Sequence, residues 1–387
     1  MNRVDILGAV KIINNRVKPF DGKKRYLATG NLSNQGIDNF VFVDYENKPS
    51  RADLMVSEGD LILARMKATN KIFLIDCDSE DLIVSTGFLT LKPKDGFDGR
   101  YLYHYFRSNK FQQLKDRFCS GATQKAINNN SFKKLKVPHY EIEQQRKIVQ
   151  ILDTTDNLRQ KRKEQLVLLD DYLKSVFLEM FGDPHSNPKG FIVRELKEFY
   201  CDEKDGTKCG PFGSALKKYE YTNEGIPVWN MDNISLDGQM LLEVNLFITE
   251  EKYCQLKAYS TFNGDVIISR AGTVGKMCVL QSSFENSIIS TNLIRVRFNK
   301  QLLPDYFVSL MTYCKGRIGR LRTGSDGSFT HMNTGILDSL KFPYPPLGLQ
   351  KKFVEAKNNI ELIKQKMRDS LNEMDNYFNT LMQRYFE

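Results

Sequence analysis

The residues of this 387-residue chain that could do chemistry do not fall at the spacings that known reactions need. Residues 272–276 read Gly-Thr-Val-Gly-Lys, which is similar to a phosphate-binding loop but lacks the G-x-x-x-x-G-K-[ST] spacing that cradles a nucleotide. Residues 344–346 read Tyr-Pro-Pro, where an amino-methyltransferase has Asn or Asp, and nothing here can accept the protons of an amine. We therefore expect no catalytic residue and interpret this tripeptide as a rigid turn before a helix.

Nuclease and metal sites are not indicated either. Residues 202–204 (DEK) and 250–252 (EEK) are short mixed-charge runs, which we interpret as solvated loop charges rather than as a nuclease site built from loop carboxylates. The seven cysteines form no C-x-x-C pair, and the four histidines lie far apart. We expect no metal, no cofactor and a reducing, cytoplasmic environment.

The charge balance points to a polyanionic partner. Lys and Arg number 56 against 47 Asp and Glu, which gives a formal charge of +9. The sequence contains no apolar run of membrane-spanning length, so we expect no membrane partner and favour nucleic acid.

An internal repeat organises the elements that must position any binding residues. Residues 59–65 (GDLILAR) align with residues 264–270 (GDVIISR), at an offset of 205 residues. The register holds without a gap for more than a hundred positions. Further pairs at this offset are Ser85 with Ser290, Asn128 with Asn333, Gln145 with Gln350, and Asp170 with Asp375. The chain therefore contains two copies of one plan.

Each copy is predicted to be an α+β domain followed by a long helix. The Gly-Asp turns open predicted strands at 60–64 and 265–269, and apolar spacing predicts helices over 97–118 and 304–321. The long helices are predicted over 144–181 and 351–386, with a coiled-coil-like apolar seam. We predict domains at 1–142 and 183–347, with spacer helices at 143–182 and 348–387. Tandem copies usually pack about a two-fold axis, which would make the two helices antiparallel.

Two loops in each copy carry side chains suited to DNA. Arg, Lys, Gln and Asn read base edges, and Gly, Ser and Thr suit contacts to the backbone of the duplex. For Arg65 and Arg270, pairing with carboxylates inside the domain is an equally good interpretation. The candidate DNA-binding residues are Arg65, Lys67, Lys71, Thr123, Gln124, Lys125, Arg270, Gly272, Thr273, Lys276, Ser325 and Ser328.

Apolar residues near the helix ends are candidates for partner binding, because exposed aromatic residues often mark contact sites. The alternative is that they cap the coiled-coil seam. These residues are Phe177, Met180, Phe181, Tyr385 and Phe386.

The order and duplication of several short motifs resemble the specificity (S) subunit of type I restriction–modification systems. The motifs are residues 177–184 (FLEMFGDP), 210–214 (GPFGS), 225–228 (GIPV), 264–276 (GDVIISRAGTVGK), 289–293 (ISTNL), and 345–347 (PPL) with Gln350. The resemblance covers essentially the whole chain.

The resemblance implies a non-catalytic subunit with two target-recognition domains, each reading one half of a bipartite, asymmetric DNA sequence. The long helices would form an antiparallel spacer and dock two methyltransferase (M) subunits, which gives an adenine methyltransferase, and restriction (R) subunits would complete the endonuclease. Copy one has residues 66–70 (MKATN) where copy two has residues 271–275 (AGTVG), so the two halves should read different sequences. The alternatives are a nuclease with an unfamiliar loop-carboxylate site and a scaffold that binds only proteins.

Overall fold

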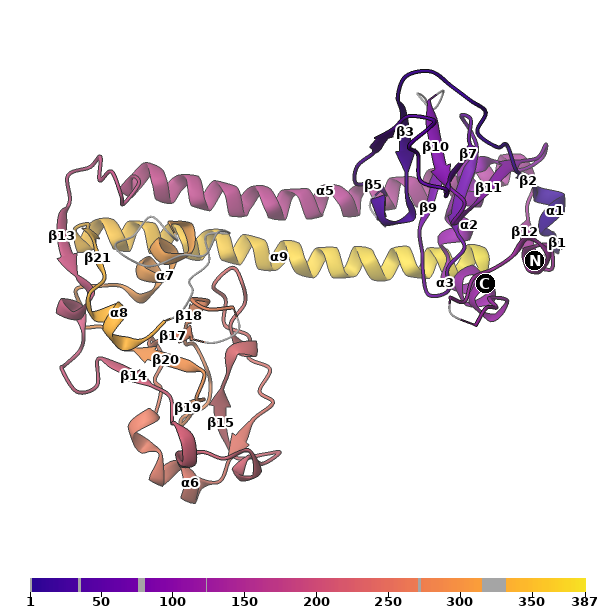
Figure 1. Ribbon diagram of the computed structural model, residues 1–387. Helices are drawn as coiled ribbons and strands as arrows, with labels where there is room; N and C mark the ends of the chain where they lie inside the picture. The colour runs from indigo at the N-terminus through magenta and orange to yellow at the C-terminus, as the bar shows by residue number, and fades with distance from the viewer. Residues whose placement is uncertain (1, 34–35, 76–80, 123, 271–272, 315–331) are drawn as a thin grey trace. The chain divides into compact units, whose positions relative to one another are not determined.

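The computed structural model describes residues 2–33, 36–75, 81–122, 124–270, 273–314 and 332–387 (Figure 1). The chain divides into two compact units. Unit 1 comprises Met1–Glu164 with Met367–Glu387, and unit 2 comprises Gln165–Lys366. Each unit combines small β-sheets with helices, so the predicted α+β class with two repeated domains and two long helices is confirmed.

Unit 1 contains three sheets and a short hairpin. The strand orders are β1-β12, β6-β3-β10-β7, β2-β11-β8-β9 and β4-β5. The strands are β1 (Asn2–Asp5), β2 (Val10–Ile13), β3 (Lys24–Leu27), β4 (Leu32–Ser33), β5 (Gly36–Ile37), β6 (Val41–Val43), β7 (Ala52–Met55), β8 (Leu61–Ala64), β9 (Ile72–Leu74), β10 (Leu82–Ser85), β11 (Phe88–Pro93) and β12 (Lys136–His139). The helices are α1 (Ile6–Ala9), α2 (Gly99–Arg107), α3 (Asn109–Arg117), α4 (Asn129–Phe132), the first part of α5 (Ile142–Phe181) and the last part of α9 (Leu347–Phe386).

Unit 2 repeats this topology. Its strand orders are β13-β21, β16-β15-β19 and β14-β20-β17-β18, and β15 pairs with β19 in parallel, as β3 does with β10. The strands are β13 (Ile192–Glu195), β14 (Thr207–Cys209), β15 (Ile226–Trp229), β16 (Phe247–Ile248), β17 (Val266–Ser269), β18 (Met277–Val279), β19 (Ile288–Ile289), β20 (Leu293–Val296) and β21 (Lys341–Tyr344). The helices are α6 (Glu250–Gln255), α7 (Pro304–Tyr313), α8 (Thr334–Asp338), the last part of α5 and the first part of α9 (Leu347–Phe386).

The predicted Gly-Asp strands form the centre of each unit. Every residue of β8 and β17 is buried, as expected for a strand covered on both faces. The turn before each strand is held in the same way, because the Asp60 carboxylate accepts a hydrogen bond from the Ser57 amide and the Asp265 carboxylate accepts one from the Phe262 amide. The repeated Gly-Asp motif therefore encodes a turn and a core strand.

The helix predicted over 97–118 is wrong as a single element. The structure has two helices, α2 and α3, which are separated at Ser108. Ser108 has extended backbone angles, and its hydroxyl caps α3 by accepting a hydrogen bond from the Phe111 amide. Apolar spacing alone missed this break, because the local hydrogen bond of a serine competes with continuation of the helix. The helix predicted over 304–321 is observed as α7, and residues 315–321 lie outside the described ranges.

The long helices run antiparallel within each unit (Figure 1). In unit 1, Arg159 of α5 lies 2.5 Å from Asp375 of α9, and in unit 2, Lys364 of α9 lies 2.6 Å from Asp170 of α5. Arg159 and Lys364 occupy equivalent positions of the repeat, as do Asp170 and Asp375. The same ion pair therefore forms in both units, with α5 supplying the cation in unit 1 and α9 supplying it in unit 2. The antiparallel pairing predicted from symmetry is therefore confirmed within each unit.

A buried glutamine fixes each long helix to its own domain. Gln145 Nε2 donates to the carbonyls of Gly96 and Tyr140, and Gln145 Oε1 accepts from the Asp98 amide. Gln350 makes the three equivalent bonds in unit 2, to Gln301, Pro345 and Leu303. Both side chains are fully buried, so the start of each helix is held by hydrogen bonds that water does not share.

Across the described ranges, no helix is both long enough and apolar enough to span a membrane.

Candidate nucleic-acid interface

The two predicted DNA-binding loops of copy one lie side by side in unit 1. The Lys67 amide donates to the Lys125 carbonyl at 2.9 Å, and Met66 forms an isolated bridge with Ala126. The side chains of Lys67, Gln124 and Lys125 are exposed. The structure thus brings two lysines and a glutamine onto one surface, which we call the unit 1 loop surface. Thr123 lies outside the described residues.

Helix α3 holds the turn that carries Lys67. Lys115 is fully buried, and its ammonium donates to the carbonyls of Met66 and Thr69. The Asp116 carboxylate accepts from the Ala68 amide, where the backbone has a φ of +56°. An alanine in this left-handed conformation needs such support. The turn is therefore preorganised, with its lysine directed to solvent.

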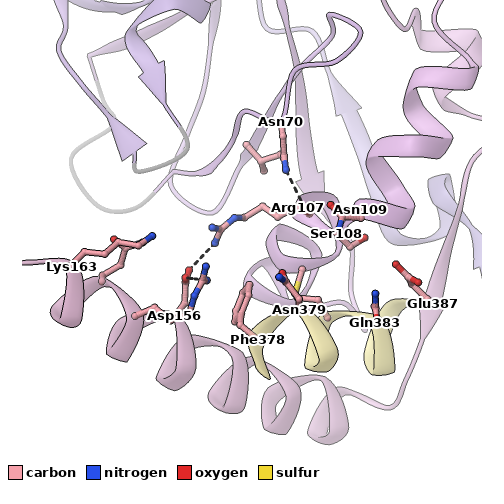
Figure 2. A pocket seen from close by; sticks show the side chains of 14 residues that line it. Asn70, Arg107, Ser108, Asn109, Asp156, Lys163, Phe378, Asn379, Gln383 and Glu387 are labelled. Carbon is pink, nitrogen blue, oxygen red and sulfur yellow. Dashed lines mark hydrogen bonds and ion pairs between the residues drawn. The ribbon is translucent and has the colours of Figure 1, made fainter. Parts of the chain in front are cut away.

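The other end of this turn is connected to the long helices of unit 1. Asn70 Nδ2 donates to the Arg107 carbonyl, and the Arg107 guanidinium pairs with Asp156 of α5 at 2.9 Å. Figure 2 shows these residues around a polar hollow of about 330 Å³, with Phe378 of α9 in its wall. Asp156 also accepts from Arg159, which pairs in turn with Asp375. A continuous polar network therefore runs from the candidate loop to both helices.

Two other predicted residues of copy one have structural partners. The Arg65 guanidinium donates to the carbonyls of Phe88 and Ile127 and to Asn129 Oδ1, and burial lowers its pKa. Arg65 therefore binds backbone oxygens rather than the carboxylates of the alternative interpretation. The Lys71 ammonium donates to the Thr29 carbonyl at 2.9 Å. Both side chains are held by bonds inside the domain, and their contact with DNA stays a prediction.

Arg270 occupies the position of Arg65 in copy two but has different surroundings. Its guanidinium lies over the ring of Phe212, 4.7 Å from the centroid. No described residue accepts a hydrogen bond from it, and Nη1 is buried without a partner. An unsatisfied guanidinium over an exposed aromatic ring is a group that still needs an acceptor. Of the two matched arginines, Arg270 is thus the stronger candidate for DNA contact, which stays a prediction.

Lys276 repeats the structural role of Lys71. Its ammonium donates to the carbonyls of Met231 and Ile234, which are equivalent to Thr29 and Leu32 of copy one. Thr273 is exposed beside it. Gly272, Ser325 and Ser328 lie outside the described residues, so the second predicted loop of copy two is not seen.

The aromatic residues predicted to bind partners are mostly core residues. Phe177, Phe181 and Phe386 are buried, and Met180 and Tyr385 are partly buried against the same clusters. The Phe177 and Phe353 rings lie 5.1 Å apart across the helix pair of unit 2. This packing matches the alternative in which these residues cap the seam, because their apolar surface is already covered. Partner binding by them stays an untested prediction.

Acidic and metal-binding groups do not converge. Among the described residues, no three His, Cys, Asp or Glu side chains are placed to hold a metal ion. The carboxylates of the two runs singled out in the sequence lie in local structure. Asp202 accepts from the amides of Lys204 and Asp205, and Glu250 and Glu251 lie in the first turn of α6.

A comparison with protein families now decides the assignment. The family model described as "Type I restriction modification DNA specificity domain" matches residues 5–168 and, a second time, residues 209–372. The chain belongs to this family. The two matches coincide with the two copies of the repeat.

Known specificity subunits resemble the chain over most of its length. The type I restriction enzyme MjaVIII specificity subunit of Methanocaldococcus jannaschii is 24% identical over 364 residues, which cover 88% of this chain and 80% of that protein. The putative specificity subunit S.HindORF215P of Haemophilus influenzae is 20% identical over 385 residues, covering 93% and 87%.

Solved structures share the fold. A chain from a structural study of assembly and conformational transition in the type I restriction–modification system has a TM-score of 0.64 at 19% identity, covering 99% of this chain and 97% of its own. The type I S subunit from M. genitalium has a TM-score of 0.56 at 16% identity, covering 100% and 96%.

Sequence reasoning about this specificity subunit missed residues at which the copies differ. It singled out matched positions together with loop residues such as Lys67 and Gln124, and the structure shows several of the matched residues bonded to the backbone. Asn70 and Asn292 were not singled out as DNA-binding residues, although each stands where the other copy has glycine. The signal that could have found them is divergence between the two copies, since domains that read different sequences must differ at the reading positions.

Proposed function

We propose that this chain is the non-catalytic subunit that reads a bipartite, asymmetric DNA target and directs methyltransferase and restriction subunits to it. The observation that carries the proposal is the duplicated DNA specificity domain, each copy with its own core and its own divergent loops. Two domains with the same scaffold and different loops suit two half-sites of different sequence. The methylated base would be adenine, and the chemistry would belong to the partner subunits.

The unit 1 loop surface supplies the electrostatic part of DNA binding. Lys67 and Lys125 are exposed on adjoining loops, and Gln124, which precedes Lys125, has the donor and acceptor that recognise adenine in the major groove. The polar network of Figure 2 holds this surface against the helices. In unit 2, Arg270 over Phe212 provides the corresponding cation.

Exposed apolar residues on the long helices support docking of two methyltransferase subunits. Within unit 2, Val167, Leu168 and Tyr172 of α5 and Leu362 and Ile363 of α9 are all at least 45% exposed. Apolar side chains exposed in this number along helices are typical of protein interfaces. Restriction subunits would join the complex that the methyltransferase subunits form.

Selection from a random duplex pool tests the proposal. We expect one bipartite sequence to be enriched and the affinity to fall steeply with salt, because phosphate contacts release counterions. The double variant Lys67→Ala/Lys125→Ala should lower the salt slope by about one per lost phosphate contact. Lys161→Ala, an exposed lysine of α5, is the matched control.

The same samples separate the alternatives. A nuclease would cut the selected duplex in Mg²⁺, whereas we expect no cutting by the chain alone. A protein-only scaffold would show neither enrichment nor a salt slope. Either result would contradict the proposed function.

A further inference from the structure

A cleft of about 240 Å³ in unit 2, lined by both polar and apolar residues, has no functional assignment so far. It lies where the ends of β15 and β19 meet the start of β20, beside Arg270. The residues that shape it include Tyr221, Asn230, Asp232, Ser290, Thr291 and Asn292.

The cleft contains hydrogen-bonding groups without partners. Ser290 is 6% exposed, and its hydroxyl is buried without a hydrogen bond. Asn292 is exposed at the rim, and no described residue bonds to its amide side chain. Buried polar groups normally have partners, so an unpaired hydroxyl in the wall of an open cleft indicates a missing one.

The matched place in unit 1 is closed. Gly87 stands at the position of Asn292, and a Cβ atom there would lie 2.9 Å from Thr29 Cγ2. The Ser85 hydroxyl, equivalent to that of Ser290, accepts a hydrogen bond from the Gly87 amide at 3.1 Å. Ala28 replaces Asn230. In unit 1 this place is therefore filled, and its serine hydroxyl is hydrogen-bonded. In unit 2 the same place is an open cleft, and its serine hydroxyl has no hydrogen-bond partner.

Neighbouring groups hold the cleft in place, and the Asp232 carboxylate also lines it. The Asn292 carbonyl accepts from the Arg270 amide at 3.0 Å, and the Lys276 ammonium lies 3.1 Å from the Met231 carbonyl. Gly210 packs so closely that a Cβ atom would lie 1.9 Å from the Ser290 carbonyl oxygen, which fixes the floor. A base edge brought here would meet the polar groups of Asn292 and Ser290, with Arg270 as the next-door cation through its backbone contact to Asn292.

We propose that this cleft receives the edge of a base pair in the half-site of unit 2, with Asn292 as the residue that selects adenine. The assignment rests on the proposed function and specifies which residue determines specificity. An asparagine amide can pair with N6 and N7 of adenine at once, and glycine at the unit 1 position can make no such contact. Ser290 provides a second polar group deeper in the cleft.

Competitive DNA binding by the complex of this chain with its methyltransferase subunit tests the assignment. The probes are the duplex bound by the wild type and a panel with each base pair of both half-sites replaced in turn. For Asn292→Ala, we expect discrimination at one adenine position of one half-site to fall about tenfold or more. Asn292→Asp should instead favour cytosine there, because a carboxylate accepts from cytosine N4. Asn223→Ala, an exposed asparagine outside the cleft, should change nothing.

The outcomes are distinct. Unchanged discrimination at every position, or an equal loss of affinity for all duplexes, would overturn the assignment of Asn292 while leaving the proposed function intact. A wild-type complex that discriminates at no position would overturn the proposed function and the assignment with it. Thermal unfolding of each variant checks the fold, and the unaltered half-site is an internal reference in every titration.

Discussion

Replacing Gln145 by leucine should destabilise unit 1 through the loss of three hydrogen bonds. The side chain is fully buried, and its bonds to Gly96, Asp98 and Tyr140 are 2.8, 2.9 and 2.8 Å long. Leucine has a similar size and helix propensity, so the change mainly leaves three backbone groups without partners. At the low end of the cost of an unsatisfied buried group, we expect a loss of about 3 kcal/mol in the free energy of unfolding.

Urea unfolding of the full chain, with hydrogen exchange to locate the change, measures this effect. Gln144→Leu is the control, because Gln144 is exposed. The free energy of unfolding of this variant should stay within about 0.5 kcal/mol of the wild-type value. Gln350→Leu should reproduce the loss in unit 2, where the three bonds recur. If Gln145→Leu behaves like Gln144→Leu, the reasoning that this side chain fixes α5 to its domain is refuted.

Three further predictions concern the core, pH and helix length. Gly210→Ala should destabilise unit 2 by about 1–3 kcal/mol in urea unfolding, because a Cβ atom would meet the Ser290 carbonyl; wild-type stability would contradict this. Burial holds the pKa of His104 below 6.5, so the unfolded chain takes up the proton first and unit 1 should lose stability as pH falls below about 6.5. His104→Asn should weaken the pH dependence of the free energy of unfolding, measured in urea. An unchanged pH dependence would refute the conclusion that His104 causes it. Deleting four residues from α5 should shift the gap between selected half-sites or abolish selection, and an unchanged gap would count against the spacer role.

The fold was largely predictable because the sequence contains two copies of one domain, which can be compared with each other. Residues that recur at the offset of 205, such as Asp60 with Asp265 and Gln145 with Gln350, make the same hydrogen bonds in both units. The break at Ser108 was not predictable from apolar spacing, because it depends on one side-chain hydrogen bond. The burial of Phe177 and Phe386 was not predictable either, since a helix sequence does not show which aromatic residues the domain covers.

The candidate site was predictable only in part. Repetition directed attention to Lys71 and Lys276, whose ammonium groups hold backbone carbonyls in both copies. Lys67 was singled out by its residue type and its place after the Gly-Asp strand, and it does lie beside Lys125 on the surface. Asn292 was missed, because its significance lies in the difference from Gly87 and in a cleft that only the structure shows. In a chain with two such domains, residues that are the same in both copies maintain the fold. Residues that differ between the copies are the better candidates for DNA sequence specificity.

Co-expression of this chain with its methyltransferase subunit, followed by methylome sequencing, tests the central claim most directly. The account predicts one new adenine-methylated motif, made of two different specific parts separated by a gap of fixed length. A methyltransferase that methylates nothing new, or a single continuous motif, would contradict a specificity subunit that reads two half-sites with its two units.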